Sequence, residues 1–344
     1  MGFRITTNMM MNNYRYNLMG ANNKLNDSQS KVLTQRTFTS FAEDPAAATQ
    51  SFRLRRGLYE NSSHTSSNEA VIQKFNSAWS ALGSIVTDLS DRTARVAAVT
   101  GTTGTTGESR TTLGQVLKET ARSVIQTMNV SYGDHFMFAG NDGLNVPFSW
   151  DGDKLLYRGV DVNSTDPADL VKLDAMAAEE LNIDLGMGLK EDGSGKLING
   201  SAFDSSLSGI KILGYGVDKD GDPKNLACIM QRLGEIFSQC DNASGDYASA
   251  GEEEEANRLM GKLKDAQGRV TSEYVELDAK SKFLTTNASR LDEVKTAITE
   301  QLLSLEQVDL ADALTTFSWD QYCYNAALKI GNQLLSQSLI DYMN

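Results

Sequence analysis

The sequence EEEEANRLMGKLKDAQGRVTSEYVELDAKSKFLTTNASRLDEVKTAITEQLLSLE, residues 252–306, contains the longest uninterrupted periodic pattern of the chain. Apolar residues recur in it every seven positions, at Leu263, Val270, Leu277, Leu284, Leu291, Ile298 and Leu305. A repeat of this length is typical of a helix that packs one stripe along another helix, as in a coiled coil. At 1.5 Å of rise per residue, a single helix over this stretch would be about 80 Å long.

A second long helix, from Pro45 toward Val99, carries a matching stripe. Two series with seven-residue spacing run through it: Ile72, Trp79 and Val86, and Phe75, Leu82, Leu89 and Val96. Asp44 is a suitable N-cap, with Pro45 at the first helical position. Proline is absent from residues 46–146 and 224–344, which permits very long helices. We expect these two stripes to pack on each other and to stabilise the subunit's own fold.

The two ends of the chain carry weaker repeats. Near the N-terminus, Met11, Leu18 and Leu25 recur every seven residues. The residues three positions after them are Tyr14, Ala21 and Ser28, so small residues weaken this seam. These helices could be ordinary bundle core, but amphipathic end helices without a bulky partner layer are marginal alone. We therefore predict that they bury their apolar faces in an assembly. The predicted assembly interface consists of Met11, Leu18, Leu25, Val32, Leu314, Phe317, Tyr324, Leu328, Leu335 and Tyr342.

Between the helical halves the sequence changes character. The Gly- and Thr-rich run at 101–107 predicts a loop, and a shorter helix follows from Leu113 to about Met128. Across 141–222, Asp-Gly turns separate strand-like runs at 154–157 and 209–215. Helix resumes at Pro223.

We predict a mainly α protein with a β-rich insert. The simplest way to cover the stripes is an elongated antiparallel coiled-coil or helical-bundle rod with both termini at one end. Three domains are expected: 1–40 with 307–344, 41–140 with 223–306, and the insert at 141–222.

The composition excludes several classes of function. A formal net charge of −13 disfavours nucleic acids and anionic membranes as partners. Three cysteines without metal spacing and two histidines, His64 and His135, predict no metal site. The acidic run at 218–222 resembles a calcium loop, but its glycine is misplaced, so a turn is expected. The sequence contains no cluster of convergent polar residues that would indicate catalysis. We therefore expect that the protein is not an enzyme, binds no cofactor and has no transmembrane helix.

Four stretches carry a resemblance to the flagellin superfamily, and more narrowly to the hook-associated protein 3 family of hook–filament junction proteins. They read RITTNMM at 4–10, AEDPAAA at 42–48, VDLADA at 308–313 leading to LLSQSLIDY at 334–342, and, more loosely, FMFAG at 136–140. Residues 34–40 read TQRTFTS where that family usually has a Ser-Gly turn.

The resemblance implies a structural role in the bacterial flagellum, as the adaptor between hook and filament. It implies a ring of copies, with hook-associated protein 1 on the hook side, flagellin on the filament side and an export chaperone at the C-terminal helix. It also implies an extracellular location reached by type III export, without a cleaved signal peptide. The alternative within the superfamily is flagellin itself, the filament subunit.

Overall fold

The computed structural model describes residues 7–100, 107–194, 197–198, 200–241 and 244–343, with side chains for 9–99, 109–194, 197–198, 200–241 and 244–333. Its contacts divide the chain into two compact units. Unit 1 consists of Met1–Ser62 and Glu293–Asn344, and unit 2 consists of Ser63–Asp292. The three-domain division inferred from the sequence has other boundaries and stays a prediction.

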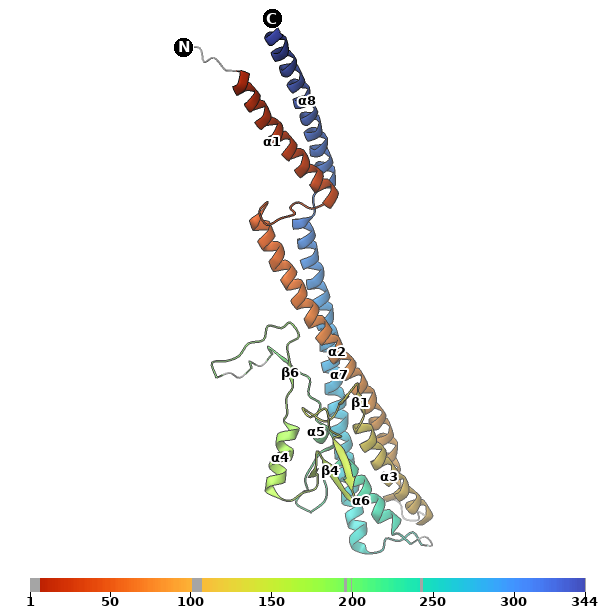
Figure 1. The fold of residues 1–344 in the computed structure, drawn as a ribbon. Helices are drawn as coiled ribbons and strands as arrows, with labels where there is room; N and C mark the ends of the chain where they lie inside the picture. Colours follow the sequence, from red (N-terminus) through yellow and green to blue (C-terminus); the bar gives the residue numbers. More distant parts are fainter. Residues whose placement is uncertain (1–6, 101–106, 195–196, 199, 242–243, 344) are drawn as a thin grey trace. The chain divides into compact units, whose positions relative to one another are not determined.

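Unit 1 is helical. It contains α1 (Thr7–Thr34), α8 (Leu310–Met343), the start of α2 (Pro45–Thr100) and the end of α7 (Ala250–Glu306). An antiparallel bridge pairs Arg36 with Gln307, where α1 ends and α8 begins, so α1 and α8 run antiparallel to each other. The first residue of α1 and the last of α8 therefore lie at the same end of this helix pair (Figure 1).

The turn before α2 forms as the sequence predicts. The Asp44 carboxylate Oδ1 accepts hydrogen bonds from the backbone N–H groups of Ala46 and Ala47, at 3.1 and 2.9 Å. These are two of the N–H groups that lack a partner inside the helix. Asp44 is thus the N-cap of α2, with Pro45 as its first residue.

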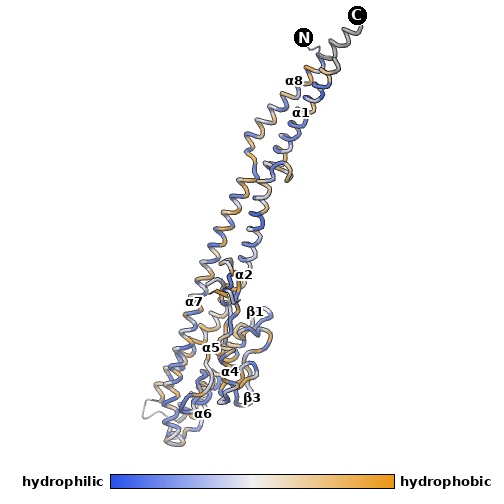
Figure 2. Tube along the Cα trace, turned by 90° about the vertical axis from the view of Figure 1, so that its left-hand side faces the viewer, coloured by the Kyte–Doolittle hydropathy of each residue, from blue (hydrophilic) through white to orange (hydrophobic). Residues whose placement is uncertain are grey.

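Unit 2 holds most of the buried apolar residues. The rest of α2 and α7 packs there with α3 (Gly107–Met128) and α6 (Leu226–Ser238). Along α2 and α7, hydrophobic positions recur among hydrophilic ones (Figure 2). Phe75, Leu82, Leu89 and Val96 are at most 1% exposed, as their spacing predicts. Trp79 is 39% exposed and stacks on Tyr274 at 5.3 Å, so the series of Ile72, Trp79 and Val86 lies beside the main seam.

Glycines allow α3 and α6 to approach closely. A Cβ atom on Gly114 would lie 2.8 Å from the carbonyl oxygen of Gly234, and one on Gly234 would lie 2.7 Å from that of Gly114. Real Cβ atoms do not sit this close to a carbonyl, so both positions require glycine.

The insert and the segment just before it form short antiparallel sheets. β1 (Ser131–Tyr132) pairs with β2 (His135–Phe136), and β6 (Asn182–Ile183) pairs with β7 (Phe203–Asp204). The largest sheet has the order β3 (Phe148–Asp151), β4 (Lys154–Tyr157) and β5 (Val160–Asp161). The strand predicted at 154–157 is confirmed, and Gly152 makes the predicted turn before it with a φ of +62°.

Two local predictions differ from the structure. Residues 209–215 are not a strand but include a short helix, α5 (Gly209–Leu213). Ile210, Ile212 and Leu213 are buried there, and a continuous apolar run does not distinguish a buried helical turn from a buried strand. Helix resumes three residues later than predicted, because Pro223 pairs with Val217 and Asn225 caps α6. A longer helix, α4 (Pro167–Ala177), also lies within the insert.

No helix of the described residues is both long and apolar enough to cross a membrane.

Candidate assembly surface

The N-terminal members of the predicted interface form one face of α1. Met11, Leu18, Leu25 and Val32 are each half-buried, and Ser28 on the same face is buried. The residues between these positions are mostly exposed. Since α1 packs on α8, this face is the one that α8 partly covers. The predicted seam of α1 thus coincides with the face that α8 covers in part, and its role in an assembly stays a prediction.

On α8, the partly buried face contains one of the two predicted rows, that of Phe317 and Tyr324, but not the row of Leu314 and Leu328. Ala313 is buried, and Phe317 and Tyr324 are half-buried. Gly331 is also buried, and a Cβ atom there would collide with the ring of Tyr14 on α1. These positions are spaced by four or seven residues and share one helix face.

Leu314 and Leu328 do not belong to that seam. They are 46% and 43% exposed, and they lie on an adjacent side of α8. The side chains of Leu335 and Tyr342 lie outside the described ones. Of the eight predicted interface residues whose side chains are described, Leu314 and Leu328 are therefore the most open to a further partner.

Sequence periodicity missed several exposed apolar residues, because they fall outside the seven-residue series. Trp319 and Tyr322 are 66% and 67% exposed and stack on each other at 5.9 Å. A helix that is apolar on more than one side is normally covered on more than one side. The other large exposed apolar residues of α1 and α8 are Met9, Met10, Tyr16, Met19, Leu33, Leu310 and Ile330.

The α2 and α7 segments of unit 1 show the same exposure. Phe52 and Tyr59, seven residues apart on α2, are 71% and 78% exposed. Where α2 meets α7, the contact is partly polar. Arg55 donates to both carboxylate oxygens of Glu306, at 3.0 and 2.6 Å, and the Ser51 hydroxyl donates to the same carboxylate. The hydrogen bond from Arg55 is the main reason that the pKa of Glu306 is lowered.

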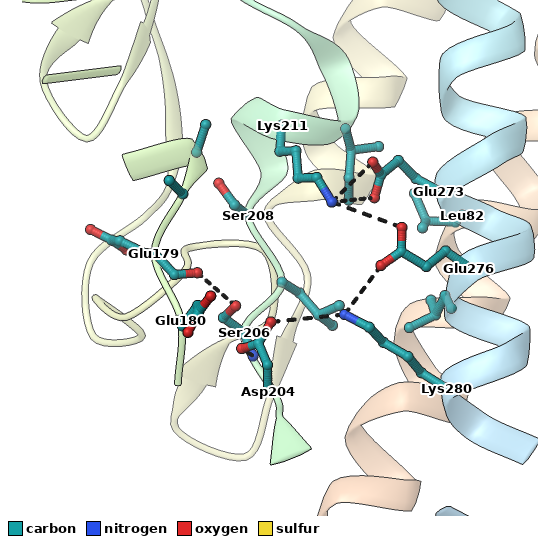
Figure 3. Close-up of a pocket in the computed structure, with 15 residues that line it drawn as sticks. Leu82, Glu179, Glu180, Asp204, Ser206, Ser208, Lys211, Glu273, Glu276 and Lys280 are labelled. Carbon is teal, nitrogen blue, oxygen red and sulfur yellow. Dashed lines mark hydrogen bonds and ion pairs between the residues drawn. The ribbon is translucent and has the colours of Figure 1, made fainter. Parts of the chain in front are cut away.

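Unit 2 contains a cavity of about 260 Å³ between the insert and α7 (Figure 3). Lys280 lies 3.4 Å from Glu276 and 3.8 Å from Asp204. Lys211 lies 3.2 Å from Glu273. The lysines are thus paired with the carboxylates, and these ion pairs connect the insert to α7. Among the described residues that line the cavity, we find no nucleophile hydrogen-bonded to a base, which a hydrolytic site would need.

The acidic run Asp218, Asp220 and Asp222 forms the turn that the sequence predicts. Val217 pairs with Pro223 across it, and Gly221 has a φ of +84°. The Lys262 ammonium contacts all three carboxylates, so a side chain of α7 lies where a cation would otherwise bind. The hydrogen bond from Lys262 is the largest cause of the lowered pKa of Asp218. This cluster fastens the loop before α6 to α7.

Comparisons with known proteins agree with the resemblance seen in the sequence. Residues 5–142 match the family model of the bacterial flagellin N-terminal helical region. A solved structure from Vibrio parahaemolyticus, described as a flagellar hook-associated protein, covers 76% of this chain and 99% of its own, with a TM-score of 0.57 and 16% identity. A flagellar hook-associated protein 3 from Legionella pneumophila covers 73% and 98%, with a TM-score of 0.50 and 13% identity. No curated protein matches. The chain therefore shares the fold of these flagellar proteins, and its mainly helical architecture with a β-containing insert is confirmed.

Proposed function

We propose that this chain, which carries a flagellin N-terminal helical region at residues 5–142 and shares the fold of flagellar hook-associated proteins, is a structural subunit of the hook–filament junction. It works by packing, not by catalysis. It sits outside the cell in a ring of identical copies, with hook-associated protein 1 on the hook side and flagellin on the filament side.

One observation carries this proposal: unit 1 leaves many of its large apolar residues exposed. Among the described side chains, that of Ala313 is the only apolar one of unit 1 that is buried, whereas the core of unit 2 is extensive. Exposing many large apolar side chains is unfavourable, by roughly 25 cal/mol per Å² of apolar surface. Contiguous exposed apolar surface commonly marks a protein interaction site. Other copies and axial neighbours in the ring would cover it.

The same exposure supports a second partner before assembly. An apolar helix face that is not yet buried in a ring favours aggregation. We propose that an export chaperone covers α8 until the chain has left the cell by type III export without a cleaved signal peptide.

Flagellin itself is the alternative function, since the matched family model is a flagellin region. The two roles differ in abundance. A filament subunit should dominate sheared filaments, whereas a junction adaptor should be a minor component. Deleting the gene separates them further: without the adaptor, cells build hooks but release flagellin monomers into the medium. Normal motility, or absence of hooks, contradicts the adaptor role.

A sharper experiment charges the exposed side of α8. In the variant Leu314→Asp/Leu328→Asp, the two aspartates lie in solvent in the free subunit, so its circular dichroism and unfolding should barely change. Its incorporation into the junction should fail, because an unpaired charge is costly to bury. The matched control is Val275→Asp, at a site on α7 in unit 2 that is 60% exposed. This control should assemble normally. If both variants assemble equally well, the α8 surface is not an interface.

A further inference from the structure

A buried pair of asparagines interrupts the apolar contact between α2 and α7. Asn68 on α2 is fully buried, and Asn287 on α7 is 5% exposed. The Asn287 side-chain Nδ2 donates to Asn68 Oδ1 at 3.2 Å, and Asn68 Nδ2 donates to the Leu284 carbonyl at 3.0 Å. The two carboxamides thus satisfy each other across the helix contact.

The insert takes part in the same network. Asn287 Nδ2 also donates to the Leu185 carbonyl at 3.1 Å. Arg290 donates through Nε and Nη2 to Asn287 Oδ1, at 3.1 and 2.9 Å, and through Nη2 to the Gly186 carbonyl at 2.9 Å. The loop after β6 is therefore joined by hydrogen bonds to one particular residue of α7.

The conformation and the surroundings of Gly186 both favour a residue without a side chain. Its φ is +77°, and a Cβ atom there would lie 3.2 Å from Leu291 and 3.3 Å from the His64 ring. The backbone of the loop can come this close only because residue 186 is glycine, which accepts this conformation at little cost. The close approach of this backbone and the asparagine network thus involve the same segments of α2 and α7.

The apolar stripe alone does not define a unique alignment of the two helices. The stripe of α7 repeats every seven residues with similar side chains, such as Leu277, Leu284 and Leu291. If α7 slid by seven residues along α2, apolar residues would again face apolar residues. Asn68 would then face Lys280 or Val294 instead of Asn287. A buried carboxamide without a partner costs about 1–3 kcal/mol.

We propose that Asn68 and Asn287 select the register in which α2 and α7 pair during folding, and that the loop at Leu185 and Gly186 closes only on the pair in this register. A single buried polar position is a known means of fixing register in coiled coils. This inference concerns unit 2 alone and does not depend on the proposed flagellar role.

Disulfide trapping during refolding tests it. Asn76 and Ser281 are hydrogen-bonded across the helix pair at 3.1 Å, so Asn76→Cys/Ser281→Cys reports the native register. Asn76→Cys/Ala288→Cys reports a shift of seven residues. Both reporters also carry Cys323→Ser, because Cys323 is exposed. Each full-length chain is refolded from urea with oxidised glutathione, and the cross-links are measured by mass spectrometry.

We expect the chain with both asparagines to form only the native cross-link. With Asn68→Leu/Asn287→Leu added, the shifted cross-link should appear as well, since leucine has a similar branched shape and no hydrogen bonds to satisfy. If the leucine pair refolds poorly, Asn68→Ala/Asn287→Leu gives the same test with less volume. Absence of the shifted cross-link in folded chains of either variant overturns the proposal.

Arg290→Ala is the matched control, because it removes the contact to the loop but keeps both asparagines. It should form only the native cross-link. A shifted cross-link in this control would assign register selection to the arginine and the loop, and would also contradict the proposal.

Discussion

Unit 1 and unit 2 share the helices α2 and α7, and the seven-residue stripe of α7 passes through both. In unit 2, Leu263, Val270, Leu277, Leu284 and Leu291 are at most 3% exposed. In unit 1, Ile298 and Leu305 continue the same series but are only half-buried. The residue types hardly change along the stripe, so the difference comes from what surrounds it. Unit 2 supplies α3, α6 and the insert as further layers, whereas the helices of unit 1 pack in pairs.

The comparison teaches that an apolar repeat predicts a contact but not the partner that completes it. A helix with one apolar stripe must bury that stripe against another element, and unit 2 does so within the chain. Unit 1 covers only part of its stripe within the chain, and we propose that other molecules cover the remainder. If so, substitutions in unit 2 should affect the stability of the free subunit, and substitutions in unit 1 should affect assembly.

The largest effect should follow truncation of a core aromatic in unit 2. Phe75 is fully buried and packs on the ring of Phe203 at 5.6 Å. Phe75→Ala should lower the free energy of unfolding by about 3–5 kcal/mol, because it removes apolar contact and leaves a cavity. The matched change in unit 1, Leu18→Ala at a half-buried site, should cost only about 1 kcal/mol. Urea unfolding followed by circular dichroism measures both. Equal losses would remove the distinction between the units.

This distinction also marks how far the sequence alone could lead. Spacing identified both long helices, the seam of α1 and the turn at Asp44, since each depends on local chemistry and a seven-residue period. On α8 it included Phe317 and Tyr324, which lie on the seam, but it also included the exposed Leu314 and Leu328 and missed Ala313 and Gly331. Small residues carry little hydropathy, yet Gly331 allows the close approach of Tyr14. The polar contacts of unit 2, such as Lys262 with Asp218, join residues too distant in sequence for any local pattern to predict.

Helix caps should show a smaller contrast between the units. Asn225 is fully buried, accepts from the Ala227 N–H at 3.0 Å and donates to the Gly214 carbonyl at 2.7 Å. Asn225→Ala should cost about 2–3 kcal/mol, because it removes the cap and leaves buried groups without a partner. The Asp44 cap is exposed, so Asp44→Ala should cost about 1 kcal/mol. Thermal unfolding of the two variants gives this ranking, and the opposite ranking would contradict it.

Acid should affect unit 1 through Glu306. The hydrogen bond from Arg55 is the main reason that the pKa of this carboxyl is lowered from 4.5 in the folded state. A depressed folded pKa stabilises the fold above the unfolded value, and this stabilisation is lost as the pH falls through the folded pKa. Lowering the pH from 6 to below 4.5 should therefore weaken the contact of α2 with α7 in unit 1.

Glu306→Gln isolates that effect, because glutamine does not titrate. The variant should be less stable at pH 7, and the pH dependence of unit 1 below 4.5 should be reduced. Trp319 is the only tryptophan of unit 1, so its fluorescence in a chain with Trp79→Phe and Trp150→Phe reports this unit. An unchanged pH profile in the glutamine variant would show that other carboxyls, such as Glu43, control the acid response.

The smallest effect should come from an exposed ion pair on the part of α2 that belongs to unit 1. Arg56 and Glu60 lie 2.9 Å apart in α2, with 74% and 54% of their side chains exposed. Water and salt screen such pairs, so Arg56→Ala should change the free energy of unfolding by only about 0.5 kcal/mol or less.

Arg158 and Glu179 in unit 2 form the contrasting pair, at 2.8 Å and with only 18% and 20% exposure. Removing one of these less exposed partners leaves the other poorly solvated, so Glu179→Gln should cost more than Arg56→Ala. Urea midpoints measured at 0.1 and 1 M salt decide the matter, because added salt should reduce the Arg56 effect more. A large, salt-insensitive loss for Arg56→Ala would mean that unit 1 is held together by its charges in the free subunit, and its exposed apolar residues would then be weaker evidence for assembly.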